Sequence, residues 1–255
     1  MVDLLVNRRA VKNVQLVVFD KDGTIVDLYV YWSNMVRLRA ERLCRVYSLD
    51  PGKHRDGLMS AMGIDLGRRR LKPEGPVGLL PRAVVQKAAE RYLNRLGHKK
   101  TQGPCEQVFK DVDQASLSRL GELIRPIPGA RELLRALKRN DVRIAIATTD
   151  KTHRAEVAVT FLGIGKLVDL VVGDDKVKRS KPAPEMLQVI IKTLGIPPER
   201  SVMVGDAVTD IEMGDRAGFG ASIGVCSGLT DRKRLLSLTP WVARDISKID
   251  VRRRL

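Results

Sequence analysis

The chain has 255 residues, of which 44% are hydrophobic and 30% charged, a composition typical of a folded globular protein rather than a disordered one. Only 4% of the residues are aromatic, which argues against a surface on which nucleic-acid bases stack. The 46 lysines and arginines outnumber the 30 acidic residues, and the resulting net charge of +16 predicts an anionic partner. Because the basic residues are spread along the sequence, a surface that attracts small anionic substrates is favoured, with nucleic-acid binding as the alternative.

The three cysteines lie far apart and show no C-x-x-C spacing, so neither a disulfide framework nor a zinc site is indicated. The N-terminal residues contain no apolar segment typical of a signal peptide, and no run of roughly 18 apolar residues occurs anywhere. We therefore expect a cytoplasmic protein, either a monomer or a homodimer, with no membrane partner.

The first predicted strand is the apolar run from Val14 to Phe19, which ends in the polar loop DKDGT. A short and nearly continuous apolar run is typical of a strand buried on both faces of a parallel sheet. In the loop, Asp20 and Asp22 can converge on one cation, and Gly23 lets backbone amides approach a bound phosphate. The alternative interpretation is an Asx-rich turn between a strand and a helix.

The next segment, residues 28–125, is predicted to be a helical cap domain inserted into a core formed by residues 1–27 and 126–255. Apolar residues at three- and four-residue spacing predict three helices, at Ser33–Tyr47, Pro81–Leu96 and Cys105–Leu120. Between the first two of these helices, the Gly-, Pro- and Arg-rich residues 63–81 are predicted to form a loop.

A cluster of basic side chains lies in this predicted loop, at Arg68, Arg69, Arg70 and Lys72. The cluster could bind a second anionic group of a substrate, such as a carboxylate, or it could simply face solvent.

After the insertion, apolar runs and helical patterns alternate along the chain. Four further strands are predicted, at Val142–Ala147, Leu167–Val172, Ser201–Val204 and Ala221–Val225. The helices predicted between and beside them are Gly129–Arg139, Arg154–Leu162, Pro184–Leu194 and Ile211–Ala217. This alternation predicts an α/β fold with a doubly wound parallel sheet, Rossmann-like in its connections.

Polar side chains follow three of these strands. Thr148 and Thr149 end the second strand, where a hydroxyl can donate to a phosphoryl oxygen or cap the next helix. Lys181 follows the third, where it can neutralise charge beside a bound phosphate or be solvated. Asp206 and Asp210 follow the fourth, one helical turn apart, and can supply the oxygen ligands that Mg²⁺ prefers. An N-cap and a surface aspartate are the alternative for that last pair.

The ordered set FDKDGT, TT, KPAPE and VGDAVTDIEMGDRAG resembles the four motifs of the haloacid dehalogenase superfamily. The spacing is similar to that of its phosphoglycolate phosphatase-like and β-phosphoglucomutase-like members, in which a helical cap follows the first motif. The resemblance covers residues 13–27 and 126–250, and the segment between them is similar only in its position and helical character.

The resemblance implies a Mg²⁺-dependent phosphatase acting on a small anionic phosphate monoester such as phosphoglycolate or a sugar phosphate. Asp20 would attack phosphorus to form an aspartyl-phosphate, and Asp22 would act as the general acid and base. Thr148, with the amides around Gly23 and Thr149, would hold the phosphoryl oxygens.

The resemblance also implies roles for the remaining charged residues of the site. Lys181 would offset charge in the transition state, and Mg²⁺ would bind the Asp20 carboxylate, the Asp22 carbonyl and Asp206. Asp210 would bind the ion directly or orient another of its ligands.

Two residues depart from the usual pattern of the superfamily. Lys21 stands where an apolar residue is common between the two aspartates, and Thr149 stands where Ser or Asn is usual. Neither change removes a catalytic group. A phosphosugar mutase using the same aspartyl-phosphate, and a basic nucleic-acid-binding module, are the alternative functions.

Overall fold

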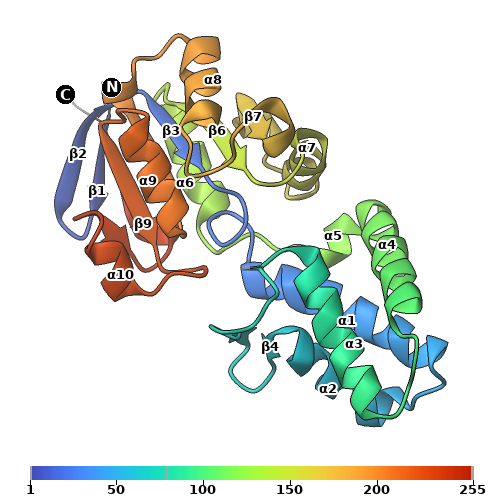
Figure 1. Ribbon diagram of the computed structural model, residues 1–255. Coiled ribbons are helices and arrows are strands. Elements are labelled where there is room, and N and C mark those ends of the chain that lie inside the picture. Colours follow the sequence, from blue (N-terminus) through green and yellow to red (C-terminus); the bar gives the residue numbers. More distant parts are fainter. Residues whose placement is uncertain (1, 79, 254–255) are drawn as a thin grey trace. The chain divides into compact units, whose positions relative to one another are not determined.

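The computed structural model describes residues 2–78 and 80–253. The chain divides into two compact units, one formed by Met1–Asp27 with Ile124–Leu255 and the other by Leu28–Leu123 (Figure 1). We refer to them as the core unit and the helical unit.

The core unit is built around a six-stranded sheet in which every pair of neighbouring strands is parallel. The strand order is β10-β9-β8-β3-β6-β7. The strands are β3 (Leu16–Phe19), β6 (Arg143–Thr148), β7 (Leu170–Gly173), β8 (Ser201–Gly205), β9 (Ala221–Val225) and β10 (Val242–Ala243). The predicted doubly wound α/β fold is confirmed. Strand β10 was not predicted, because a strand of two residues is too short to show a pattern of apolar residues.

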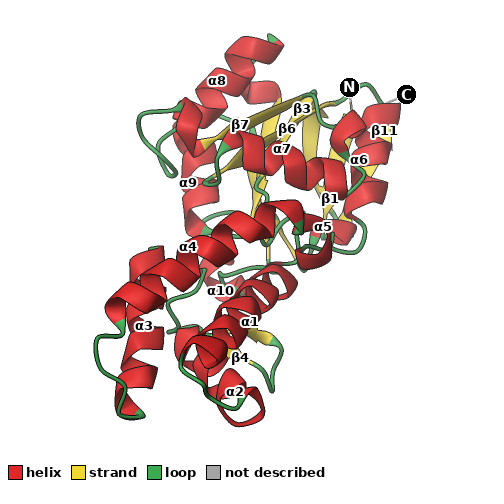
Figure 2. Ribbon diagram, turned by 90° about the vertical axis from the view of Figure 1, so that its right-hand side faces the viewer, coloured by secondary structure: helices red, strands yellow, loops and turns green. Residues whose placement is uncertain are grey.

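Helices cover both faces of this sheet (Figure 2). They are α6 (Ala130–Arg139), α7 (Thr152–Phe161), α8 (Glu185–Leu194), α9 (Val208–Arg216) and the short α10 (Arg232–Leu236). On one face, Leu187 of α8 and Met213 of α9 pack against Val18 and Ala145 in a fully buried cluster. Short 3₁₀ turns complete the connections at Gly165–Leu167, Asp174–Lys176, Pro198–Arg200 and Ile246–Lys248.

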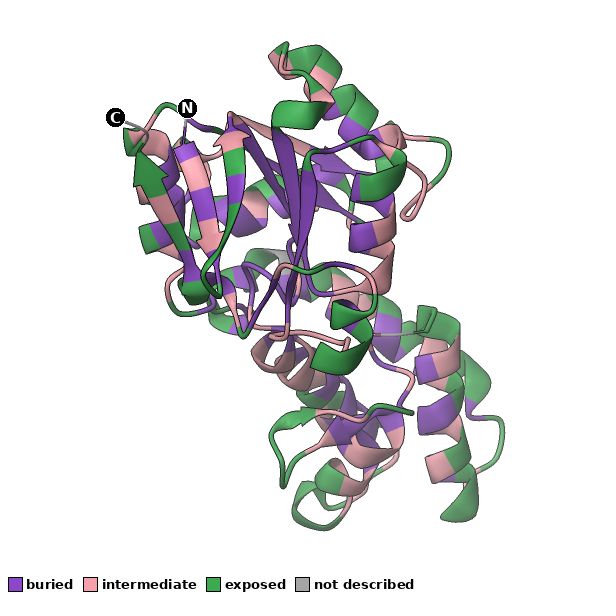
Figure 3. Ribbon diagram, turned by 90° about the vertical axis from the view of Figure 1, so that its left-hand side faces the viewer, coloured by how far each residue is buried: buried purple, intermediate pink, exposed green. Residues whose placement is uncertain are grey.

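A second, antiparallel sheet in the core unit was not predicted. It has the order β11-β1-β2, formed by β1 (Val2–Val6), β2 (Arg9–Val14) and β11 (Ile249–Arg253). Residues along β1 alternate between buried and half-buried, which Figure 3 shows as colour bands on the strand. The predicted strand at 14–19 is therefore wrong at its start, because Val14 ends β2 and β3 begins at Leu16.

The helical unit contains α1 (Leu28–Val46), α2 (Pro51–Met62), α3 (Arg82–Arg95), α4 (Gln102–Ser118) and α5 (Leu120–Leu123). Helix α2 was missed because only three of its residues, Leu58, Met59 and Met62, are buried, so its apolar stripe is weak. The start of α2 does carry an N-cap residue that the sequence could have indicated, because the Asp50 side chain accepts a hydrogen bond from the Gly52 N–H.

The segment 63–81 is not wholly a loop, because it contains a short antiparallel hairpin of β4 (Ile64–Asp65) and β5 (Arg70–Leu71). Across the described residues, no helix combines the length and the hydropathy that crossing a bilayer requires.

The two connections between the units leave the core unit side by side. Just before α1, the Asp27 N–H donates to the Arg125 carbonyl (2.9 Å), and Val26 forms an antiparallel bridge with Pro126. The insertion therefore begins and ends at one place in the core unit.

Candidate active site

The candidate catalytic residues gather at one edge of the parallel sheet. Strand β3 lies between β6 and β8, so the residues that follow these three strands emerge next to one another. Asp20 follows β3, Thr148 is the last residue of β6, and Asp206 follows β8. Lys181 reaches the same place from the loop after β7, because its ammonium contacts Asp20.

Three carboxylates form a tight and buried cluster at this edge. Oxygens of Asp20, Asp206 and Asp210 all lie within 4.8 Å of one another. Asp206 and Asp210 are only 2% and 1% exposed, and Asp20 is 9% exposed. Buried like charges at this separation repel, so the cluster fits a hard cation with oxygen ligands such as Mg²⁺.

Two carboxyl groups of the cluster, Asp20 and Asp206, have raised pKa values. Burial raises the pKa of Asp20 to about 7, and the charges of Asp210 and Asp22 add to the effect while Lys181 opposes it. Burial also raises the pKa of Asp206 well above its usual range, again with Asp20 and Asp210 contributing. A cation bound here would offset both the burial of these charges and their mutual repulsion, and so lower these pKa values.

Lys181 supplies the positive charge closest to the cluster. Its ammonium is 2.5 Å from Asp20 Oδ1 and 2.8 Å from Asp210 Oδ1, and its side chain is 4% exposed. Burial alone would lower the pKa of Lys181, but the two carboxylates outweigh burial and raise it, so the side chain stays charged.

Among the described residues, the Lys181 ammonium pairs with Asp20 and Asp210 and not with Asp175, which precedes it in the same loop. Instead, Asp175 accepts hydrogen bonds from the backbone N–H (2.6 Å) and the hydroxyl (2.9 Å) of Thr152, at the start of α7.

Glycines make room for the Asp206 carboxylate. Gly23 has a φ of +92°, and a Cβ added there would lie 2.6 Å from the Asp206 carboxyl carbon. A Cβ on Gly228 would overlap the same carboxylate. The Gly23 N–H donates to the Val26 carbonyl (2.8 Å), and the missing side chain of this glycine allows the close approach of the Asp206 carboxylate.

Donors from the protein orient the two aspartates that follow β8. Asp206 accepts from the Thr24 hydroxyl (3.2 Å) and from the Leu229 N–H (2.9 Å). Asp210 accepts from the Ala207 N–H (3.0 Å) as well as from Lys181, so both of its carboxylate oxygens already have a donor.

The two threonines that end β6 and begin its loop differ in their surroundings. Thr148 is buried, and its hydroxyl oxygen accepts a hydrogen bond from the Asp150 N–H (3.1 Å). Because the hydroxyl oxygen is the acceptor there, its proton is available for another acceptor. The side chain of Thr149 is exposed, in contrast to that of Thr148.

Asp22 lies apart from the three-carboxylate cluster and contacts Lys21. The Lys21 ammonium is 2.5 Å from Asp22 Oδ2 and 3.1 Å from Asp150 Oδ2. Burial raises the pKa of Asp22, while the charge of Lys21 opposes that rise. Sequence reasoning noted Lys21 as unusual but missed this contact, for which the alternating charges in the loop were the available signal.

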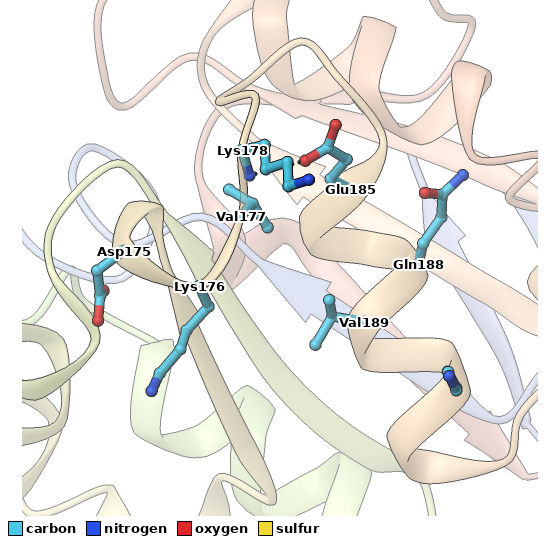
Figure 4. A pocket seen from close by; sticks show the side chains of 8 residues that line it. Asp175, Lys176, Val177, Lys178, Glu185, Gln188 and Val189 are labelled. Carbon is cyan, nitrogen blue, oxygen red and sulfur yellow. Dashed lines mark hydrogen bonds between the residues drawn. The ribbon is translucent and has the colours of Figure 1, made fainter.

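A surface hollow of about 500 Å³ lies beside the loop that carries Lys181, and none of the three clustered carboxylates lines it (Figure 4). Within it, the Glu185 carboxylate accepts hydrogen bonds from the backbone N–H groups of Lys178 (2.9 Å) and Arg179 (3.0 Å). Glu185, in the first turn of α8, therefore holds in place the part of the loop that precedes Lys181.

The basic cluster of the helical unit is divided by the structure. Arg68, Arg69 and Arg70 are exposed on and beside the β4–β5 turn, and Arg69 lies over the Tyr29 ring at 5.6 Å. Lys72 instead donates to the Ser60 carbonyl (2.8 Å) and hydroxyl (2.7 Å), so its role is structural.

Comparison with known proteins gives consistent matches. Residues 14–218 match the family model of haloacid dehalogenase-like hydrolases. A phosphorylated carbohydrates phosphatase of Thermotoga maritima is 26% identical over 222 residues, covering 87% of this chain and 90% of that protein. An N-acetylmuramic acid 6-phosphate phosphatase of Pseudomonas aeruginosa is 36% identical over 115 residues, covering 45% of this chain and 50% of that protein.

Among solved structures, a subfamily IA hydrolase of the same superfamily from Geobacter sulfurreducens superposes with a TM-score of 0.67. The match covers 92% of this chain and 94% of that one, at 16% sequence identity. At that identity the likeness concerns the fold.

Proposed function

The chain belongs to the haloacid dehalogenase-like hydrolases and is a phosphatase of that family, and we propose that it hydrolyses a small phosphate monoester through an aspartyl-phosphate on Asp20. Phosphoglycolate or a sugar phosphate is the proposed substrate class, and Mg²⁺ the proposed cofactor. The observation that carries the proposal is the buried cluster of Asp20, Asp206 and Asp210 with Lys181 bridging two of its members.

In the proposed first step, the Asp20 carboxylate attacks phosphorus and the bond to the substrate alcohol breaks. Asp22 gives its proton to the departing oxygen, so the alcohol leaves neutral. In the second step, Asp22 takes a proton from water as that water attacks phosphorus, which releases inorganic phosphate and restores Asp20. Each aspartate thus ends the cycle in its starting protonation state.

The phosphoryl oxygens would be held by donors that surround Asp20. The buried Thr148 hydroxyl has its proton available, the Thr149 amide lies in the following loop, and the Lys181 ammonium is in contact with Asp20. Charge that develops on these oxygens in the transition state is stabilised best by donors already in place.

We propose that Mg²⁺ is held by the carboxylates of Asp20 and Asp206 and by the Asp22 carbonyl, where it would neutralise charge on the cluster and on the phosphate. Asp210 is assigned an orienting role, because its two oxygens already accept from Lys181 and Ala207.

We further propose that the helical unit is a cap that recognises the part of the substrate beyond its phosphate. The exposed guanidinium groups of Arg68 and Arg69 suit a carboxylate or a second phosphate. A cytoplasmic location is proposed as well, supported by three free cysteines, Cys44, Cys105 and Cys226.

The test is release of inorganic phosphate from p-nitrophenyl phosphate, phosphoglycolate and several sugar phosphates, with and without Mg²⁺. We expect Mg²⁺-dependent release by the wild type and its loss in Asp20→Asn. Asp169→Asn is the matched control, because Asp169 pairs with Lys138 outside the cluster. Transfer of phosphate within a sugar without release would point to a mutase, and no turnover of any substrate would contradict the proposal.

A further inference from the structure

Lys21, between the two catalytic aspartates, is buried rather than solvated. Its side chain is 4% exposed, and its ammonium contacts carboxylate oxygens of Asp22 (2.5 Å) and Asp150 (3.1 Å). Burying a lysine ammonium is costly unless it is paired, so these contacts define where the side chain sits.

The contacts of Lys21 extend into a small charge network that joins two loops of the core unit. Asp150 follows β6, and its Oδ2 also lies 3.8 Å from Arg154 Nε in the first turn of α7. Lys21 therefore ties the loop after β3 to the start of α7 through a second carboxylate. Along these contacts, the basic side chains of Lys21 and Arg154 alternate with the carboxyl groups of Asp22 and Asp150.

Asp22 is held in an orientation that it would not keep alone. Its Oδ2 contacts Lys21, whereas its Oδ1 is buried and has no hydrogen-bond partner among the described residues. A buried acceptor without a donor costs about 1–3 kcal/mol. The contact with Lys21 offsets that cost, and without it the carboxylate would be expected to rotate towards solvent.

We propose that Lys21 is a positioning residue for the proton-transfer steps, holding the Asp22 carboxyl in place while Asp150 holds Lys21. The inference rests on the proposed phosphatase function. The proton passes from Asp22 to the leaving alcohol oxygen as the bond between phosphorus and that oxygen breaks, and Lys21 keeps its own protons throughout. Proton transfer needs the two heavy atoms within hydrogen-bond reach, so a rotated Asp22 would slow both the departure of the alcohol and the attack of water on the aspartyl-phosphate.

The experiment compares two leaving groups in Lys21→Met. The p-nitrophenolate ion is a weak base and departs without protonation, whereas the alkoxide of a sugar phosphate needs a proton. We expect the rate of the first step, followed as release of the alcohol or p-nitrophenol in a single turnover with enzyme in excess, to fall about a hundredfold for the best sugar phosphate and less than about threefold for p-nitrophenyl phosphate. Asp22→Asn should show the same selectivity, and Lys21→Arg should recover part of the lost activity.

Two further variants separate positioning from general damage. Asp150→Asn weakens the network from the other side while keeping Lys21, and should give a smaller loss with the same selectivity. Lys138→Met, which removes a lysine paired with Asp169 away from the site, should leave both activities unchanged.

Three results would overturn the inference while the phosphatase assignment stands: an equal loss in the first-step rate for both substrates, no loss for either, or a raised KM with unchanged kcat. The last would mean that Lys21 binds the phosphate itself. A wild type that releases phosphate from no substrate would overturn the proposed function, and the inference with it.

Discussion

At the scale of single residues, the ammonium of Lys181 is buried between the carboxylates of Asp20 and Asp210, so the stability of the protein depends on these ion pairs. Removing one partner of a buried ion pair leaves an uncompensated charge. We expect Lys181→Met to lower the free energy of unfolding of the metal-free protein by about 3–5 kcal/mol, and Mg²⁺ to restore part of it.

Denaturant unfolding with and without Mg²⁺ measures this difference. The control is Lys138→Met, whose partly exposed pair with Asp169, a carboxylate that also pairs with Arg143, should contribute about 1 kcal/mol or less. Equal losses in the two variants would show that the contacts of Lys181 are not energetically special.

The raised pKa values of Asp20 and Asp206 predict how stability depends on pH. Between the unfolded pKa of an aspartate, about 3.9, and the raised folded value, the folded state binds more protons than the unfolded state. Stability of the metal-free protein should therefore fall as pH rises through about 7, the pKa of Asp20.

Thermal unfolding from pH 5 to pH 8 tests this sign. We expect the loss with rising pH to shrink in Asp206→Asn, which removes one repelling charge, and in the presence of Mg²⁺. A wild type whose stability rises over this range, with no change in Asp206→Asn, would contradict the assigned pKa direction.

The sequence placed the clustered carboxylates in loops that follow strands, because parallel strands bring their carboxyl ends together. It could not reveal that Lys21 also reaches Asp150, or that Gly228 makes room for Asp206. Such contacts join segments whose approach depends on the complete fold, and neither residue carries a local signal for them.

At the scale of elements, most of the long helices followed from their apolar periodicity and the central strands from their continuous apolar runs, whereas the β11-β1-β2 sheet could not be predicted. Its turn between β1 and β2 uses Asn7 and Arg8 with positive φ values of 47° and 67°, and it lacks the glycine that marks such turns. Its third strand, β11, comes from the other end of the chain, so no local pattern announces the pairing.

The two faces of β1 give a matched test of what this sheet contributes. Leu4 is 1% exposed, and Leu4→Ala should lower the free energy of unfolding by about 2–5 kcal/mol. Its neighbour Leu5 is half-buried on the opposite face, and Leu5→Ala should cost about 1 kcal/mol or less. Denaturant unfolding of both variants measures the difference, and equal costs would mean that the inner face does not pack as described.

At the scale of the whole molecule, the net charge of +16 should act on the approach of substrate rather than on the chemical step. Raising ionic strength from about 0.01 M to about 0.15 M shortens the Debye length from about 30 Å to about 8 Å. We expect kcat/KM for an anionic phosphate ester to fall several-fold over this range while kcat stays constant.

Steady-state kinetics at several salt concentrations test this effect, with kcat as the internal control. A kcat/KM that does not change with salt would show that the charge serves something else. Tight, salt-sensitive DNA binding without phosphate release would support the nucleic-acid alternative instead.

The neighbouring connections at Val26–Pro126 and Asp27–Arg125 have an evolutionary consequence. The 96 residues of Leu28–Leu123 can be regarded as one long loop of the core unit, whose two ends are held next to each other by these contacts. The entropy of closing such a loop changes only slowly with its length, so insertions of different size are tolerated at that point. The residues of the core unit can therefore be inherited unchanged while the inserted helical unit is lengthened, replaced or diversified.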